Sequence, residues 1–304
     1  MASPEAGVMV VRVSELYQRY LAQRMPRKCG KIRFHGVKGV DVYNSSAPFR
    51  DADRRLIAAR VEARASEMSQ VCFFEWDGLN DALLVEDAPR FALQDPFVCW
   101  IDNQRVVGGV EVEFDAHNQP VRWRTQFWAG PSIFHMRLMT KGPWGMKDIR
   151  LVSLPDARVL VFTRPQGAIG GRGMIGWTIV DTLKDLNASS IDKATLLHHV
   201  ESMDWCGVNA AQLLPDGRVE VLAHVAHFDS ELNRHYYAAR FIFDYHSGQS
   251  STIEIVACRD DFLPGESKRD DLRDVVFPAG WLQMPEGRLL FCGTSDCEVQ
   301  WLAC

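Results

Sequence analysis

One unit occurs four times along the chain: an apolar strand, an acidic turn, an arginine and a second apolar strand. The arginines of the four copies are Arg105, Arg158, Arg218 and Arg288. Three of the turns also carry a proline, which fixes φ, and the Asp or Gly beside it tolerates the backbone that a hairpin turn requires. Each copy is therefore predicted to be a β-hairpin, at residues 97–107, 149–162, 212–222 and 281–291.

The spacing of these hairpins limits the architectures open to the chain. Their arginines are 53, 60 and 70 residues apart, and residues 31–85 leave room for one further, degenerate unit. A repeat of ~40 to 50 residues with four strands is typical of a propeller blade, with insertions lengthening some copies. A β-sandwich would also show short strands at regular spacing but would not explain a recurring hairpin. We predict an all-β fold, a five-bladed β-propeller over residues 29–304, within a single domain spanning 1–304.

Two segments outside the hairpins have a helical pattern. Apolar residues recur at 13, 16, 17, 20 and 21, which predicts an amphipathic helix over 11–24 that ends before Pro26 and forms an N-terminal extension, 1–28. Residues 181–203 are predicted to form a short helical insertion on the rim. Short apolar or alternating runs predict further strands at residues 31–35, 58–63, 71–76 and 82–85.

Composition excludes several classes of function. The formal net charge is −5, which argues against a protein that wraps nucleic acid. The eight cysteines show no CxxC pair and no Cys/His spacing of a zinc site, so we expect free thiols, no metal and a reducing compartment. No run approaches the ~18 apolar residues that a membrane span requires. We therefore expect a cytoplasmic protein with no membrane or nucleic-acid partner.

Polar clusters lie just outside the predicted hairpins, where a propeller collects loop residues from all its blades. Asp95 precedes Pro96, so it either starts an ordinary turn or serves as a general acid for a glycosidic oxygen. Residues 147–150 alternate, which places Lys147 on one face with Ile149, and Asp148 on the other with Arg150. These charges form either a surface ion pair or part of a site.

Three further clusters suit an anionic or sugar ligand. Arg164 and Arg172 flank a glycine-rich segment that would let backbone approach a phosphate, although no Lys-Ser/Thr of a nucleotide P-loop follows. Residues 233–237 combine Arg234, His235 and Tyr236. Lys268 opens a charge run that continues to residue 274. The competing interpretations of these three clusters are, in order, a solvent-facing hairpin, a packed strand and a solvated loop. His224 and His227 lie nearby in the sequence, but no third ligand supports metal binding by them.

As a set, these motifs resemble a mannosyltransferase/phosphorylase-like family once known only as a domain of unknown function. That family is related to the glycoside hydrolase family 130 β-mannoside phosphorylases. The resemblance covers roughly residues 30–300. It rests on segments 93–97 (LQDPF), 147–151 (KDIRL), 162–167 (FTRPQG), 170–173 (GGRG), 234–237 (RHYY) and 268–272 (KRDDL).

The resemblance implies a five-bladed propeller and an inverting mechanism. A single Asp acts as the acid, by motif match Asp95, and phosphate or a nucleotide-sugar phosphate takes the place of a second carboxylate. The implied phosphate-binding residues are Lys147, Arg164, Arg172, Arg234, His235 and Lys268. The implied substrate-binding residues are Asn44, Arg60, Glu62, Asp148, Arg150, Asn209, Tyr236 and Asp271. The implied partners are a β-1,2-mannan oligosaccharide, inorganic phosphate or mannose 1-phosphate, and GDP-mannose, with no cofactor or metal.

The chain departs from the family pattern at two places. Gln94 stands where a Glu usually precedes the catalytic Asp, and a segment that usually reads Trp-Gly-Gly-Ala-Asn-Glu has Ala210 and Ala211 after Asn209. These departures motivate one alternative, a carbohydrate-binding propeller that has lost catalysis. Another is a β-mannosidase-type hydrolase, which would need a second carboxylate about 6.5–9.5 Å from Asp95 to activate water.

Overall fold

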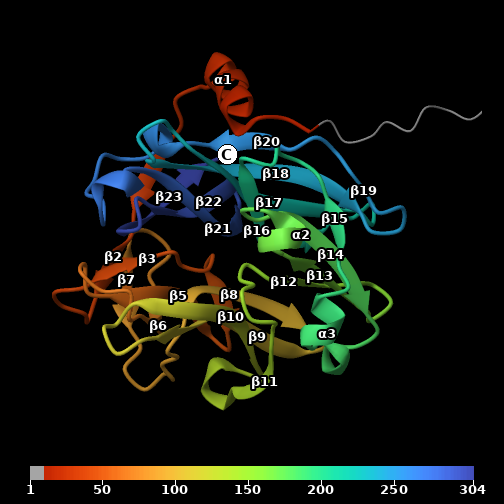
Figure 1. Ribbon diagram of the computed structural model, residues 1–304. Helices are drawn as coiled ribbons and strands as arrows, with labels where there is room; N and C mark the ends of the chain where they lie inside the picture. The colour runs from red at the N-terminus through yellow and green to blue at the C-terminus, as the bar shows by residue number, and fades with distance from the viewer. Residues whose placement is uncertain (1–9) are drawn as a thin grey trace, which may run out of the picture.

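The computed structural model describes residues 10–304, and the chain is mostly β-strand (Figure 1). The first sheet contains β2 (Arg33–His35), β7 (Asp81–Leu84), β6 (Gln70–Trp76), β5 (Arg54–Glu62), β3 (Asp41–Tyr43) and β4 (Phe49–Asp51). The second contains β8 (Gln94–Ile101), β9 (Gln104–Phe114), β10 (Pro120–Gly130) and β11 (Arg137–Lys141). The third contains β12 (Arg150–Ser153), β13 (Val159–Thr163), β14 (Ile175–Val180) and β15 (Thr195–Leu197). The all-β prediction is thereby confirmed.

The remaining nine strands form one large sheet made of two antiparallel groups. The first group contains β16 (Trp205–Leu213), β17 (Val219–Phe228), β18 (Arg234–Asp244), β19 (Gln249–Ser250) and β20 (Glu254–Ala257). The second contains β21 (Asp274–Met284), β22 (Gly287–Thr294), β23 (Glu298–Ala303) and β1 (Cys29–Lys31). A short parallel pairing of β18 with β21 joins the two groups, at His235 with Asp274 and Tyr236 with Val275. Hydrogen bonding thus gives four sheets.

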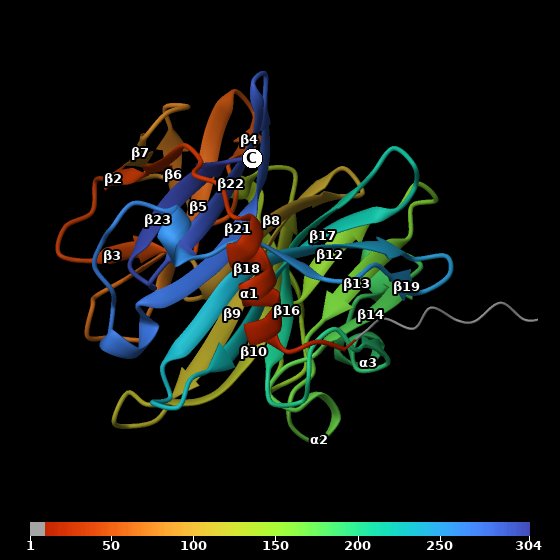
Figure 2. The same cartoon turned by 90° about the horizontal axis from the view of Figure 1, so that it is seen from above.

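One strand from each sheet lies next to a strand of the following sheet or strand group. β8 packs against β5 and β12, and β16 packs against β12 and β21. β1, near the start of the chain, pairs with β23, near its end, so the two ends of the fold share one sheet. Strands of different sheets are consequently neighbours near the middle of the fold (Figure 2).

All four predicted hairpins are present: β8–β9, β12–β13, β16–β17 and β21–β22. The first turn has φ of 52° at Asp102 and 57° at Asn103, the left-handed conformation that a two-residue hairpin turn uses and that Asp and Asn tolerate. Local turn chemistry was therefore sufficient to locate these elements.

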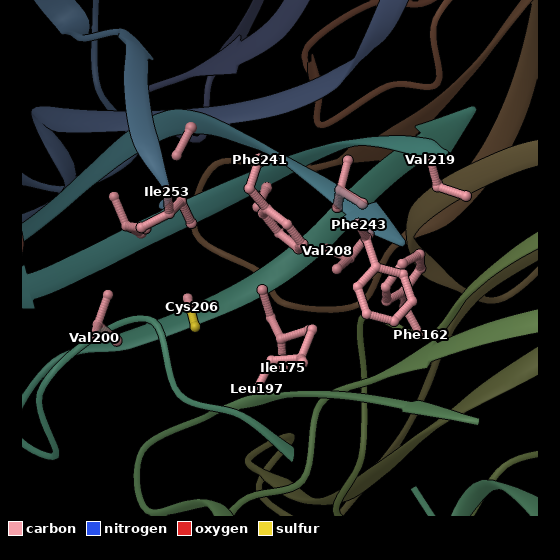
Figure 3. Packing of buried hydrophobic residues seen from close by; sticks show 14 of the residues in the cluster. Phe162, Ile175, Leu197, Val200, Cys206, Val208, Val219, Phe241, Phe243 and Ile253 are labelled. Carbon is pink, nitrogen blue, oxygen red and sulfur yellow. The ribbon is translucent and has the colours of Figure 1, made fainter. Parts of the chain in front are cut away.

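The N-terminal helix is confirmed as α1 (Val13–Gln23). Val13 and Leu16 are buried against the nine-stranded sheet, and the ring of Tyr17 stacks on Tyr237 with centroids 4.4 Å apart. The largest apolar cluster lies beneath this helix and between the third sheet and the nine-stranded sheet, where Phe162 and Phe243 meet edge to face (Figure 3). Sheet–sheet packing of this kind excludes water and fixes the strand ends that carry polar residues.

One local prediction was wrong. Residues 31–35 form two strands instead of one, because the chain changes sheets at Ile32, whose N–H donates to Val299 while that of Arg33 donates to Asn80. The short helical insertion predicted at 181–203 is confirmed by the helices η2 (Leu183–Asp185) and α3 (Ala188–Ile191), and the same segment also contains strand β15. The other short helices are η1 (Ile133–His135), α2 (Gly167–Gly170), η3 (Arg259–Asp261) and η4 (Asp270–Leu272). Across residues 10–304, the helices are too short or too polar to cross a bilayer.

Candidate functional site

Asp95 lies at the start of β8 in a strained and buried position. Its φ is +47°, and the pairing of β8 with β9 shifts register between Gln94 and Phe97, which is a bulge that redirects the side chain. Oδ1 of Asp95 accepts a hydrogen bond from Asn44 Nδ2 at 3.0 Å and from Arg60 Nη1 at 3.2 Å. Residues 10–304 supply no hydrogen bond to Oδ2. The carboxylate is therefore held by one oxygen, which leaves the other for a ligand.

A buried ion-pair network surrounds Arg60. Its Nε and Nη2 donate to Glu62 at 3.1 and 2.9 Å, and Nη2 also donates to Glu67 at 3.0 Å. Lys268, 9% exposed, donates to Glu62 and to Glu67 from the other side. Burial would raise the pKa of Glu62, but Arg60 and Lys268 outweigh it and lower that pKa. Glu62 is thus an ionised group that fixes the two cations in place.

A second carboxylate, Asp296, lies beside Asp95. Asn44 Nδ2 reaches Asp296 Oδ1 at 3.4 Å as well as Asp95, so the two acids share one amide. Burial raises the pKa of Asp296. The positive charge of Arg60 lowers that pKa and the negative charge of Asp95 raises it, and the net shift is upward. The sequence reasoning missed this residue. Its signal was weak, because Ser295-Asp296 occupies a tight turn between β22 and β23 and looks like ordinary turn chemistry.

A cavity of about 480 Å³, which we call the cationic cavity, lies next to this acidic cluster. Its charged lining consists of the cations Lys147, Arg164, Arg172 and Arg234 and the carboxylate of Glu67. Its aromatic and amide lining consists of Trp123, Trp205, Phe228, Tyr236, Gln94 and Gln166. Glu67 belongs both to this lining and to the network around Arg60, so the two clusters are continuous.

The cations of the cavity differ in how they are held. Arg164 is 3% exposed and donates to Asp148 at 3.1 Å and to the Cys206 carbonyl at 3.0 Å. Burial would raise the pKa of Asp148, yet Arg164 and Lys147 lower it to about 2. Arg172 stacks over Phe228 at 4.9 Å. Within residues 10–304, Lys147 and Arg172 have no acidic partner, which leaves their charge for an anion.

The cluster at the start of β18 faces in two directions. Arg234 pairs with Asp271, and the hydroxyl of Tyr236 accepts from Trp205 Nε1 at 3.0 Å; Arg234 and Tyr236 both line the cationic cavity. His235 points elsewhere, with Nδ1 2.5 Å from Asp274 Oδ2. His235 and Lys268 are therefore the two predicted phosphate residues that lie outside the cavity lining, whereas the other four line it.

Arg150 and Asn209 do not line the cationic cavity. Arg150 Nε donates to the Asn209 carbonyl at 2.6 Å, and Asn209 Oδ1 lies 2.8 Å from Nδ1 of His224. Burial lowers the pKa of His224 to about 3, so this histidine is a neutral hydrogen-bonding group. Arg150 and Asn209 line a separate hollow of about 210 Å³ together with Ala210, the position where the family pattern has Glu. This departure therefore lies outside the cationic cavity.

Metal ligation does not account for the polar residues of this site. Across the described chain, 10–304, no three His, Cys, Asp or Glu side chains are grouped as a metal site would require. The histidine at 227 stacks on His235, with ring centroids 4.9 Å apart. The arrangement instead supplies one carboxylate with a free oxygen and a set of cations a short distance away.

A comparison with protein families decides the assignment of the chain. The family described as a protein of unknown function, DUF1861, matches residues 18–304. The chain belongs to the DUF1861 family. This confirms the resemblance inferred from the motifs. Curated protein sequences give no match to this DUF1861 member.

Solved structures add relatives of the DUF1861 chain. MPT-4, a mannose phosphorylase from Leishmania mexicana solved with a phosphate ion, is 30% identical, with a TM-score of 0.90 over 95% of this chain and 92% of that one. MPT-1, a GDP-Man-dependent mannosyltransferase from the same organism, is 27% identical, with a TM-score of 0.88 over 96% and 94%. A β-1,2-mannobiose phosphorylase from Listeria innocua, 11% identical with a TM-score of 0.64 over 88% and 91%, shares the fold. The DUF1861 chain is thus mostly β and shares its fold with these three solved proteins.

Proposed function

We propose that this protein transfers mannose between a β-1,2-mannan oligosaccharide and phosphate, either as a phosphorylase or, with GDP-mannose as donor, as a mannosyltransferase. One observation carries the proposal: the buried carboxylate of Asp95, held through a single oxygen, is linked through Arg60 to Glu67, which lines a cavity with four cations. The likeness to a mannose phosphorylase and to a GDP-Man-dependent mannosyltransferase supports the same reaction class.

The proposed chemistry is a single displacement with inversion. Asp95, protonated at Oδ2, donates its proton to the glycosidic oxygen as the bond from that oxygen to C1 of mannose breaks. A phosphate oxygen forms the new bond to C1 from the opposite face, which gives mannose 1-phosphate and a glycan shortened by one unit. In the transferase direction, Asp95 as carboxylate accepts the proton of the attacking glycan hydroxyl while the nucleotide phosphate leaves.

The cations have two proposed tasks. Lys147, Arg164, Arg172 and Arg234 hold the phosphate and stabilise the negative charge on its oxygens. Arg60 and Lys268 instead compensate Glu62 and Glu67 and keep Asp95 in position, and His235 orders the start of β18. Asn44 and Asp296 are placed beside Asp95 to bind hydroxyls of the reacting sugar.

We also propose that the nine-stranded sheet counts as two blades. Its two antiparallel groups are joined through only two residue pairs of β18 and β21, whereas strands within each group pair over longer stretches. With the other three sheets this makes a five-bladed propeller over residues 29–304, in one domain with an N-terminal extension at 1–28.

The proposal is tested by incubating the protein with β-1,2-mannobiose and inorganic phosphate and assaying mannose 1-phosphate. Asp95→Asn should abolish product formation, whereas Asp156→Asn, which alters an exposed hairpin turn, should not. Mannose released without phosphate would identify a hydrolase instead. If neither mannobiose nor GDP-mannose is consumed while the sugar still binds, the protein is a carbohydrate-binding propeller and the catalytic proposal is wrong.

A further inference from the structure

A second hollow of about 600 Å³, which we call the neutral cavity, adjoins the cationic cavity. The two share Trp123 and Gln166 as a common wall. The neutral cavity is otherwise built by the loop of residues 142–146, the α2 segment and the rim insertion. It is thus a neighbour of the cavity proposed to hold the phosphate.

The two cavities differ sharply in charge. Four cations and one carboxylate line the cationic cavity, whereas Asp192, which is exposed, is the one ionisable residue in the lining of the neutral cavity. Trp144, Ile169 and Ala194 give the neutral cavity an apolar and aromatic surface. A lining that is mostly apolar with a few polar atoms suits an uncharged ligand.

Trp144 is fixed in place before any ligand arrives. The guanidinium of Arg122 lies 4.0 Å from its ring centroid and that of Arg124 lies 3.9 Å from it. Each arginine is anchored in turn, Arg122 by Glu113 at 2.7 Å and Arg124 by Glu111 at 2.6 Å. The part of Trp144 that lines the neutral cavity therefore loses no further side-chain freedom when a ligand binds.

The lining also carries polar atoms with nothing to bind. Across residues 10–304, no hydrogen-bond partner is present for Thr163 Oγ1, Gln166 Oε1 or Trp123 Nε1, although all three atoms are buried. Thr163 is fully buried. Unpaired buried polar atoms are costly and mark places where a ligand or water completes the hydrogen bonding.

We infer that the neutral cavity binds the mannose units of the oligosaccharide that lie beyond the reacting unit, with Trp144 as a fixed part of the cavity wall. The inference rests on the proposed function, because it assigns a place to the neutral glycan chain whose end reacts at Asp95. A neutral saccharide presents C–H groups for the apolar part of the lining and carries no charge that would need an ionic partner there.

The test measures binding as a function of glycan length. Dissociation constants of β-1,2-mannobiose and β-1,2-mannotetraose are determined by calorimetry without phosphate, so that phosphorolysis does not interfere. In the parent protein the tetraose should bind more tightly. Trp144→Ala should weaken tetraose binding about tenfold and leave mannobiose within about twofold.

Two further variants guard the interpretation. Ala194→Trp fills the neutral cavity without removing the tryptophan and should cause the same selective loss. Trp100→Ala is the control, because Trp100 also lies under an arginine, Arg105 at 4.7 Å, but is exposed and lines neither cavity. Circular dichroism checks that each variant is folded.

The outcomes separate this inference from the proposed function. If the protein forms mannose 1-phosphate but binds tetraose no better than mannobiose, or if Trp144→Ala and Ala194→Trp weaken both glycans equally, the inference is wrong and the function stands. If no β-mannoside is bound or phosphorolysed, the proposed function fails and the inference fails with it.

Discussion

Arg60 donates to Asp95 through Nη1 at 3.2 Å, and the same guanidinium donates through Nη2 to Glu67 at 3.0 Å. Glu67 lines the cationic cavity, so one buried cation connects the proposed acid to the wall of the proposed phosphate site. The guanidinium also lies 4.9 Å from the ring centroid of Tyr43, which limits its movement. The position of Asp95 is therefore set by residues of β3 and β5 rather than by its own strand alone.

Arg60→Met is expected to reduce both activity and stability. The variant leaves Asp95 and Glu62 buried without their shared cation, and breaking a buried ion pair costs about 3–5 kcal/mol. We expect a loss of that size in the free energy of unfolding, measured in urea, and a fall of at least about 100-fold in kcat/KM for phosphorolysis. The control is Arg158→Met, which breaks an exposed pair with Asp156 and should cost no more than about 1 kcal/mol. Unchanged activity of Arg60→Met would contradict the role of Arg60.

The elements predicted from the sequence are those that local chemistry determines. The four hairpins carry their own turn residues, and α1 carries its own apolar face, so neither needs the rest of the chain to be recognised. Strands β3 and β4 were missed because three residues each give no periodicity. The division of residues 31–35 between two sheets depends on Val299 and Asn80, which are remote in sequence.

The same limit applies to the site. The motifs identified which polar residues gather, but not which of them are already paired. The charge run that begins at Lys268 looks like a solvated loop in the sequence, and Arg273 in this run is indeed exposed. Lys268 itself is buried and donates to the carboxylates of Glu62 and Glu67. Asp296 was missed because its role depends on Asn44, 252 residues away along the chain.

Lys147→Ala is expected to weaken phosphate binding without affecting the fold. Lys147 lines the cationic cavity and, within residues 10–304, makes no ion pair, so its removal leaves no buried group unpaired. A hydrogen bond to a charged group is worth about 1.5–3 kcal/mol, which corresponds to an increase of about 10- to 100-fold in the KM for phosphate. The unfolding free energy should change by less than about 0.5 kcal/mol. Lys184→Ala, on the exposed rim, is the matched control and should leave the KM unchanged.

His235 predicts a dependence of stability on pH. The hydrogen bond to Asp274 raises the pKa of His235 against the opposing effect of burial, and Asp229 adds to the rise. Because the folded pKa lies above the unfolded value of about 6.5, the stabilisation is fully present below about pH 6.5 and is lost as pH rises through the folded pKa.

We therefore expect the difference in unfolding free energy between the parent and His235→Gln to be larger at pH 6 than at pH 9. The ring of His227 stacks on His235, whose nitrogens contact Asp274 and Asp229, so the measurement is repeated in a His227→Phe background. A difference that does not vary with pH would show that the charge of His235 contributes nothing.

Gly207→Ala is expected to displace Arg164 from the cationic cavity. A Cβ at Gly207 would lie 2.6 Å from Cδ of Arg164 and 2.6 Å from Cε1 of His224, closer than van der Waals contact allows. Both neighbours are buried, and His224 is held by Asn209. Arg164 is the longer and more flexible side chain, so we expect it to shift and to lose its hydrogen bonds to Asp148 and the Cys206 carbonyl. Overpacking of this kind costs about 1–3 kcal/mol, and the KM for phosphate should rise about tenfold. A double-mutant cycle with Arg164→Ala separates the causes. Once Cδ of Arg164 is absent, the glycine substitution should add little to the KM, and a full additive effect would mean that Gly207 acts through another residue.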